Sequence, residues 1–159
     1  MEKGIRMTNP FSVEVGEEVN PDRISGRDVV FYGATRIYGE KTVISPGARL
    51  GYEGPVTVED CFLGPQVELK GGLFQSSVFL EKASISVGAH VREGCLLEEE
   101  ATLGHTVGLK QTVLFPFVTL GSLINFCDCL LAGGTSRKNH SEVGSSYVHF
   151  NYTPQGDKA

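Results

Sequence analysis

The chain has 159 residues, of which 40% are hydrophobic and 21% charged, and its formal net charge is −5. This length predicts one domain, and the composition is that of an ordinary globular protein. A negative charge without a cluster of Lys and Arg argues against a nucleic-acid partner. No signal peptide is recognisable and no apolar run approaches 18 residues, so we expect no membrane association and a cytoplasmic location.

Residues 1–28 carry only a weak hydrophobic pattern, and we expect an N-terminal cap or an irregular first coil there. Downstream, apolar residues recur every six positions. A helix repeats at 3.6 residues and a single strand at 2, so a strict six predicts neither alone. The repeat is first seen at Ile44, Leu50, Val56 and Phe62.

After a five-residue step, the repeat runs through nine apolar positions: Val67, Leu73, Phe79, Ile85, Val91, Leu97, Leu103, Leu109 and Phe115. The residue four positions later is small or slim each time, at Gly71, Ser77, Ala83, Ala89, Cys95, Ala101, Val107 and Val113. Side chains alternate along an extended segment, so both sets are expected to point inward. Another five-residue step leads to Leu120, Phe126 and Ala132, with Ile124 and Leu130 as slim partners.

Three such segments make one 18-residue triangular coil, and stacked coils pair through parallel strands. The sequence therefore predicts an all-β, single-domain protein in which residues 29–159 form a left-handed parallel β-helix. Residues 133–140 lack an inward apolar residue and are expected to form a loop that leaves a corner. Apolar side chains crowd residues 115–118, which predicts a partner surface, and a three-sided prism favours a homotrimer with ligand clefts between its chains.

The four cysteines are expected to be reduced. Cys61 and Cys95 fall within the coils and are interpreted as buried, inert thiols. Cys127 and Cys129 alternate with Phe126 and Leu130, so both are expected to face outward at an interface. A Cys-x-Cys pair without further ligands at suitable spacing does not predict a zinc site, and no metal is expected.

The last third of the chain resembles a known family. Asn139 with His140, the run "VGSS" from Val143, the pair Asn151 and Tyr152, and Lys158 resemble the acetyltransferase half of the bacterial bifunctional enzyme that makes UDP-N-acetylglucosamine. The chain is also similar to standalone proteins labelled as related to UDP-N-acetylglucosamine pyrophosphorylase. The resemblance implies a sugar-nucleotide or sugar-phosphate N-acetyltransferase, with acetyl-CoA as co-substrate.

Roles follow from this resemblance residue by residue. His140 matches the general base that takes a proton from the sugar amine, a task that suits a side chain whose ordinary pKa lies near neutral pH. Substrate-binding positions carried over, or looser candidates near them, are Lys110, Lys138, Asn139, Asn151, Tyr152 and Lys158. The chain ends where the resembling proteins continue, so we expect it to be truncated and the acetyl-CoA site to lie in missing coils.

Some departures from the family leave a second function open. Asn151 follows His140 after only eleven residues, a shorter spacing than in the family, and Cys127 or Asp128 stands where a cation is expected. A non-catalytic scaffold that binds a nucleotide sugar is the alternative. Nucleotidyl transfer is not expected, because the chain has no glycine-rich phosphate loop that opens a helix. The histidine spacings also differ from those of the zinc hydratases built on the same coil.

Overall fold

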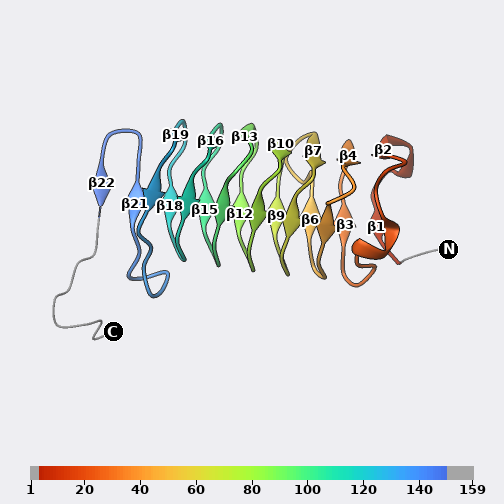
Figure 1. Ribbon diagram of the computed structural model, residues 1–159, viewed down its shortest axis with the longest axis horizontal. Helices are drawn as coiled ribbons and strands as arrows, with labels where there is room; N and C mark the ends of the chain where they lie inside the picture. The colour runs from red at the N-terminus through yellow and green to blue at the C-terminus, as the bar shows by residue number, and fades with distance from the viewer. Residues whose placement is uncertain (1–3, 150–159) are drawn as a thin grey trace.

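The backbone winds into a three-sided β-helix, and each full turn places one strand on each face (Figure 1). The structure, a computed structural model, describes residues 4–149. Face A contains β1 (Arg6–Met7), β3 (Val30–Phe31), β6 (Arg49–Leu50), β9 (Glu68–Leu69), β12 (Ser84–Ile85), β15 (Thr102–Leu103), β18 (Thr119–Leu120), β21 (Glu142–Val143) and β22 (Val148–His149). Face B contains β2 (Val13–Val15), β4 (Thr35–Tyr38), β7 (Val56–Glu59), β10 (Gly72–Gln75), β13 (Ala89–Val91), β16 (Gly108–Lys110) and β19 (Asn125–Cys127). Face C contains β5 (Val43–Ile44), β8 (Phe62–Leu63), β11 (Val78–Phe79), β14 (Leu96–Leu97), β17 (Val113–Leu114) and β20 (Leu130–Leu131).

Neighbouring coils pair through parallel strands, and the β21–β22 hairpin is the antiparallel exception among the described strands. The corner between faces C and A repeats one backbone conformation with positive φ, at Gly47, Gln66, Lys82, Glu100 and Phe117. The chain therefore turns in the same way at the same corner of successive coils. This architecture confirms the predicted all-β, left-handed parallel β-helix. In the described part of the chain, no helix is long and apolar enough to cross a membrane.

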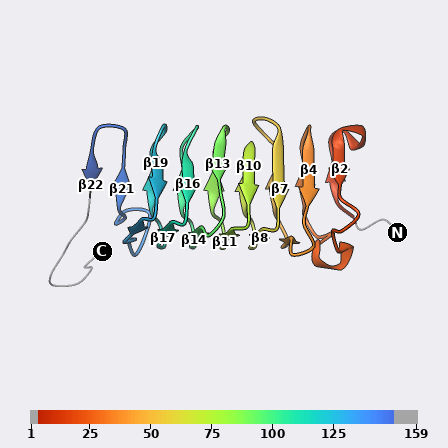
Figure 2. The same ribbon diagram turned by 45° about the horizontal axis from the view of Figure 1, so that its top comes forward.

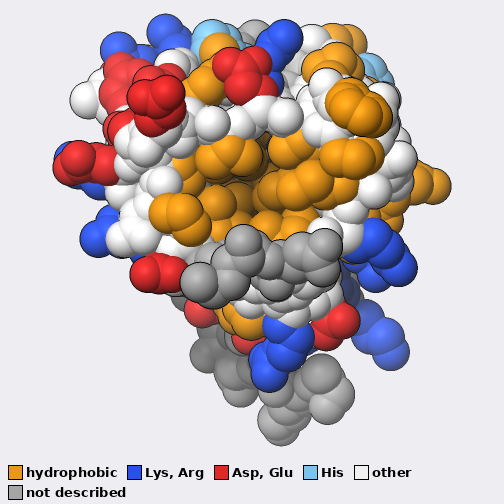
Figure 3. Space-filling view, turned by 90° about the vertical axis from the view of Figure 1, so that its right-hand side faces the viewer, with side chains coloured by type: hydrophobic (Ala, Val, Ile, Leu, Met, Phe, Trp, Pro, Cys, Tyr) orange, Lys and Arg blue, Asp and Glu red, His pale blue; other side chains and the backbone are white. Residues whose placement is uncertain are grey.

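The first coil is irregular and leaves part of its interior open. It contains two 3-10 helices, η1 (Pro10–Ser12) and η2 (Pro21–Arg23), each begun by an asparagine whose side chain accepts a backbone N–H bond. Met7 stacks on Phe31 and Val15 on Ile37, which are inward positions, yet Met7 is 36% and Val15 46% exposed. Seen from this end, apolar side chains form the floor of a hollow with a polar rim (Figure 3).

The six-residue repeat predicted most of the core. Seven of the nine central apolar residues are buried, and so are seven of their eight slim partners, Val113 being the exception. The prediction was wrong at Leu73, which is only half-buried, and at Phe115, which is 36% exposed. Their neighbours Phe74 and Leu114 fill the interior instead.

The errors have one physical cause, which is that the corners differ in length. The paired inward residues Leu50, Leu69 and Ile85 are 19 and then 16 residues apart (69 − 50, 85 − 69), although each step is one turn. Gly72 allows the tightest of these corners, because it has a φ of +136° and a Cβ there would clash with the carbonyl oxygen of Ala89. A one-residue change reverses which side chains point inward.

A one-residue shift of the same kind explains the errors at the two ends of the predicted repeat. Phe62 and Leu130 were expected inside, yet they face outward and are 39% and 66% exposed. Leu63 and Leu131 occupy the interior positions in their place. Ala132 is likewise exposed, because the loop begins directly after β20.

Small polar side chains form a column inside the corner between faces B and C. Each donates a hydrogen bond to the carbonyl of the residue two positions earlier: Cys61 to Glu59 at 3.3 Å, Ser77 to Gln75 at 2.9 Å, Thr112 to Lys110 at 2.8 Å and Cys129 to Cys127 at 3.2 Å. The buried hydroxyls and thiols at this corner thus find a hydrogen-bond acceptor inside the coil. The Glu59 and Lys110 carbonyls also accept the backbone N–H groups of Ser76 and Asp128 in the next coil. Cys129 therefore occupies an inward position, and the expectation that it faces outward with Cys127 was wrong.

Replacing a central core residue should unfold the coil. Leu97 is fully buried, and an unpaired carboxylate at that position costs several kcal/mol. We expect Leu97→Asp to abolish the cooperative thermal transition and the strand signal in circular dichroism. Glu99→Ala, at the exposed corner two residues away, should leave the melting temperature within a few degrees; equal melting of both variants would contradict the assigned register.

The four cysteines should react with a disulfide reagent at different rates, because only the thiolate form reacts rapidly. Burial raises the pKa of the Cys61 thiol to about 12 and also raises the pKa of Cys95. The hydrogen bond to Asp128 also raises the pKa of Cys127, but this thiol is exposed. In the native protein we therefore expect a water-soluble aromatic disulfide to label Cys127 first, Cys129 more slowly and the two buried cysteines only after unfolding. Cys127→Ser should remove the fast phase; a fast phase that persists would contradict this placement.

Candidate functional site

Residues 133–140 form a structured loop at the corner between faces C and A, where the chain passes from β20 to β21. Gly134 N–H donates to the Pro116 carbonyl at 2.9 Å, which fixes the start of the loop to the preceding coil. A turn closes it, because Thr135 N–H donates to the Asn139 carbonyl at 3.0 Å. Gly133 is required at the departure point, since a Cβ there would clash with the carbonyl of Pro116.

The loop folds back along this corner over earlier coils. Arg137 Nε lies 3.2 Å from the Glu100 carboxylate, and its guanidinium carbon lies 6.0 Å from the centre of the Phe117 ring. Glu100 and Phe117 are the corner residues of two successive coils. Arg137 thus connects the loop to both of them, and the loop is held in one place.

His140 ends the loop and sits beside a carboxylate. Its Nε2 lies 3.6 Å from Glu142 Oε2, and about a quarter of the side chain is exposed. Its Nδ1 is buried and has no hydrogen-bond partner. The solvent-accessible part of the ring therefore lies away from Nδ1, and Nε2 is the nitrogen with a charged neighbour. This arrangement provides a partly exposed imidazole with a carboxylate able to stabilise its protonated form.

Glu142 also binds a tyrosine. The Tyr147 hydroxyl donates to the second oxygen of Glu142, and this hydrogen bond raises the pKa of Tyr147. The β21–β22 hairpin brings the tyrosine back beside the strand. Sequence reasoning missed Glu142 and Tyr147. Glu142 could have been found, because residues two apart in a strand share a face; the hairpin that positions Tyr147 has no such signal.

The remaining predicted site residues divide into three groups. Asn139 and Lys138 lie in the loop, where the Asn139 side chain donates to Thr135 Oγ1 at 3.3 Å and the Lys138 side chain is exposed. Lys110 lies elsewhere, at the corner between faces B and C, where it pairs with Glu93 at 3.1 Å. The structure does not bring Lys110 to His140 within one chain. The positions Asn151, Tyr152 and Lys158 lie outside the described residues.

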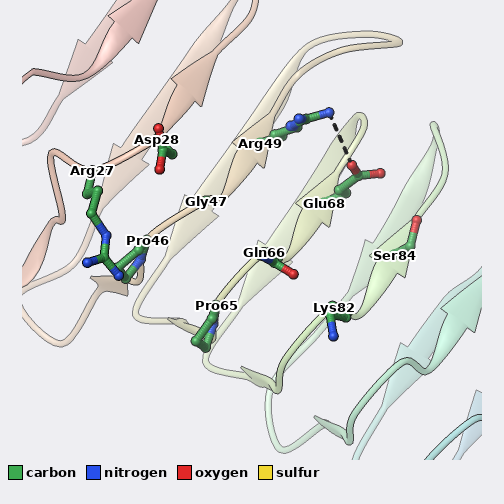
Figure 4. A pocket seen from close by; sticks show the side chains of 10 residues that line it. All are labelled: Arg27, Asp28, Pro46, Gly47, Arg49, Pro65, Gln66, Glu68, Lys82 and Ser84. Atoms are coloured by element: carbon green, nitrogen blue, oxygen red, sulfur yellow. Dashed lines mark ion pairs between the residues drawn. The ribbon is translucent and has the colours of Figure 1, made fainter.

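A second candidate surface is a groove of about 500 Å³ on face A of the earlier coils. Arg27 and Lys82 lie on separate coils with Pro65 between them, and their heads do not converge (Figure 4). Arg49 pairs with Glu68 at 3.7 Å inside the groove. Because the charges are spread and partly paired, this groove is a weaker site for a phosphate than its cations suggest. Among the described residues, no group of three or more metal-ligating side chains is present.

Sequence comparison finds relatives over nearly the whole chain. It is 25% identical to a protein named bifunctional protein GlmU from Streptococcus suis, over 96% of this chain and 30% of that protein. It is 30% identical to a GlmU protein of Thermus thermophilus, over 96% of this chain and 31% of that protein. The chain thus spans about a third of the length of the curated relatives it matches. No family model matches it.

Among solved structures, the chain shows a weak likeness to another protein. That protein is LpxA from Bacteroides fragilis, described as a UDP-N-acetylglucosamine acyltransferase. The TM-score is 0.35 at 14% identity, over 83% of this chain and 64% of the other.

Proposed function

We propose that this hexapeptide-repeat β-helix, a relative of the bifunctional GlmU proteins, transfers an acetyl group from acetyl-CoA to the amine of a sugar nucleotide or sugar phosphate, with His140 as general base. The observation that carries the proposal is the pairing of a partly exposed imidazole with Glu142 at the end of a fixed loop. The resemblance of the last third to the acetyltransferase half of the bifunctional enzyme supports the same chemistry, and the chain's similarity to GlmU proteins agrees with that resemblance.

In the proposed reaction, His140 takes up one proton and later returns it. As the sugar amine attacks the thioester carbonyl, a C–N bond forms and Nε2 takes the proton that the nitrogen loses. The C–S bond then breaks, and the proton passes from the imidazolium to the departing thiolate. Glu142 stabilises the imidazolium between these two events, and Tyr147 holds the carboxylate in position by hydrogen bonding. General-base help of this kind contributes about a hundred- to ten-thousandfold.

Substrate binding in this proposal uses the loop. Lys138 lies three residues after Thr135 and two residues before His140 in the sequence, and its side chain is exposed. Its ammonium group is suited to binding a phosphate. Asn139 remains a proposed substrate contact, and the hydrogen bond from its amide nitrogen to Thr135 orients its side chain within the loop. Lys110 could join only from a neighbouring copy, so the proposal includes a homotrimer in which clefts lie between chains. Asn151, Tyr152 and Lys158 remain proposed contacts to the sugar.

The runner-up is a binding scaffold without turnover. The observation that favours it is the state of the imidazole, because its Nδ1 is buried without a partner and its Nε2 already faces Glu142. Such a histidine can hold the loop without performing chemistry. The scaffold function predicts saturable binding of a nucleotide sugar and indifference to replacement of His140.

Acetyl transfer should depend on His140 and Glu142. With acetyl-CoA and a panel of amino-sugar phosphates and nucleotide-linked amino sugars, we expect thiol release, and we expect His140→Ala to lower kcat about a hundredfold or more. Glu142→Gln should lower kcat less, with little change in KM, because it removes only the charge beside the imidazolium. His105→Ala is the matched control, since His105 is exposed at another corner. Saturable nucleotide-sugar binding without turnover of any substrate would contradict catalysis and favour the scaffold.

A further inference from the structure

Two adjoining hollows lie on face A of the early coils. The coil of β6 has a glycine at each end of its face A segment, Gly47 and Gly51, so Arg49 is the one outward side chain between them. A hollow of about 500 Å³ lies on the side of Gly47, at the corner between faces C and A. Another of about 320 Å³ lies on the other side of Arg49, toward face B. Arg49 and Glu68 line both hollows, which together form an extended groove across face A.

The smaller hollow has an aromatic wall. Tyr32 and Tyr52 meet edge to face, with ring centres 5.3 Å apart and ring planes at 76°. Tyr32 is half-buried, whereas Tyr52 is 68% exposed. Much of the Tyr52 ring is therefore free to contact a ligand. The face of an aromatic ring is negative, so it attracts C–H groups that carry a small positive charge.

Tyr52 lies on a loop, residues 51–54, that is fixed to two later coils. The Glu53 N–H donates to the Lys70 carbonyl at 2.8 Å, and one Glu53 carboxylate oxygen lies 3.5 Å from the Lys70 ammonium group. The other carboxylate oxygen accepts the Val87 N–H at 3.2 Å. Figure 2 shows this loop, just before β7, bending toward β10. The aromatic wall is thus in place before a ligand arrives, which lowers the entropy cost of binding.

The floor between the two hollows offers hydrogen-bond donors beside acceptors. Arg49 Nη1 lies 3.7 Å from Glu68 Oε1, and both side chains are exposed by more than a third. Because this distance is longer than a hydrogen bond, the guanidinium can still donate and the carboxylate can still accept. A hydroxyl group does both, so neighbouring hydroxyls of one sugar ring can bind both partners. A phosphate group, in contrast, is repelled by Glu68.

Every cation that lines the groove has an acidic neighbour. Arg49 lies beside Glu68, Lys70 beside Glu53 at 3.5 Å and Lys82 beside Glu81 at 3.1 Å, and Arg27 precedes Asp28 in the sequence. The charges are thus balanced along the groove, and the heads of Arg27 and Lys82 do not converge (Figure 4). Balanced charges favour a neutral ligand rich in hydroxyl groups over a phosphate or an acidic peptide.

We infer that the extended groove binds a neutral oligosaccharide, at a site separate from the loop that bears His140. One sugar ring contacts Tyr52 through its C–H face, and its hydroxyls bind Arg49 and Glu68. Because the groove crosses the face to the corner at Gly47, further rings of the same chain lie along it. The inference does not depend on the acetyl transfer proposed above.

A peptide is a poorer occupant of the groove than a sugar chain. The strands beneath the groove, β3, β6, β9 and β12, already pair with their neighbours on both sides. A peptide laid across them finds no free strand edge, so it gains none of the main-chain hydrogen bonds that give strand addition its affinity. Sugar hydroxyls need only the side chains that the groove presents.

Replacing the aromatic wall should weaken binding of a neutral sugar chain. In titration calorimetry with cellotetraose, maltotetraose and chitotetraose, we expect saturable binding of at least one tetrasaccharide. Tyr52→Ala should raise its Kd about tenfold or more, because the ring contact is lost, whereas Tyr52→Phe keeps the ring and should bind normally. Phe11→Ala is the matched control, since Phe11 is an exposed ring outside the groove. No binding of any tetrasaccharide, or equal binding by Tyr52→Ala, would overturn the inference.

A second variant covers the case in which Tyr52→Ala disturbs its loop. Glu68→Gln keeps the size of the side chain but removes the charged acceptor, and we expect it to weaken tetrasaccharide binding several-fold. Glu99→Gln, at an exposed corner of a later coil, should bind normally. Tighter binding of glucose 6-phosphate or of a polyglutamate peptide at these residues would contradict the choice of a neutral sugar chain.

The same titrations separate this site from the proposed catalytic one. Tetrasaccharide binding should persist in His140→Ala and weaken in Tyr52→Ala, whether or not acetyl transfer is found. If binding were instead lost in His140→Ala and kept in Tyr52→Ala, the ligand would lie at the loop and the groove would not be its site.

Discussion

The hydrogen bonds between successive coils are the constraint on which the rest of the structure depends. They hold equivalent residues of each turn one strand spacing apart, so any side chain stands directly above and below its counterparts. A core position therefore becomes a column, such as Leu50, Leu69, Ile85 and Leu103 on face A. A column accepts only residues that pack against themselves, which explains why large and slim residues alternate so regularly.

The sequence predicted the columns well and the corners poorly. The period of six residues reflects the length of one side of the prism. From this period alone, the sequence predicted the β-helix and most of the core between Phe79 and Leu109. It failed at Leu73 and Phe115, because corners shortened by one residue leave the pattern of large residues nearly unchanged. At each failure an adjacent apolar residue offered an equally good alternative, Phe74 and Leu114. Only the backbone, through residues such as Gly72, decides between such neighbours.

The candidate site differs from the core in how it could be predicted. His140 came from a family resemblance, not from the repeat, because the loop of residues 133–140 has no period. Glu142 belongs to a regular strand, and its position beside His140 follows from alternation once the end of the loop is known. Tyr147 depends on the hairpin between β21 and β22, where the parallel rule is broken. Lys110, a looser candidate for a substrate contact, lies in the described structure at another corner of the prism, between faces B and C.

The outward columns contain information of a different kind from the inward ones. Inside, packing alone selects the residues, so their identity reports the fold. Outside, backbone pairing is satisfied whatever the side chain, and the residues there are free to follow contacts beyond the chain. Ion pairs such as Arg49 with Glu68 keep face A compatible with water, whereas Leu96 and Phe62 on face C do not. The loop that bears His140 leaves the corner between faces C and A, so the imidazole and the apolar side chains of face C lie on neighbouring parts of the same end of the β-helix.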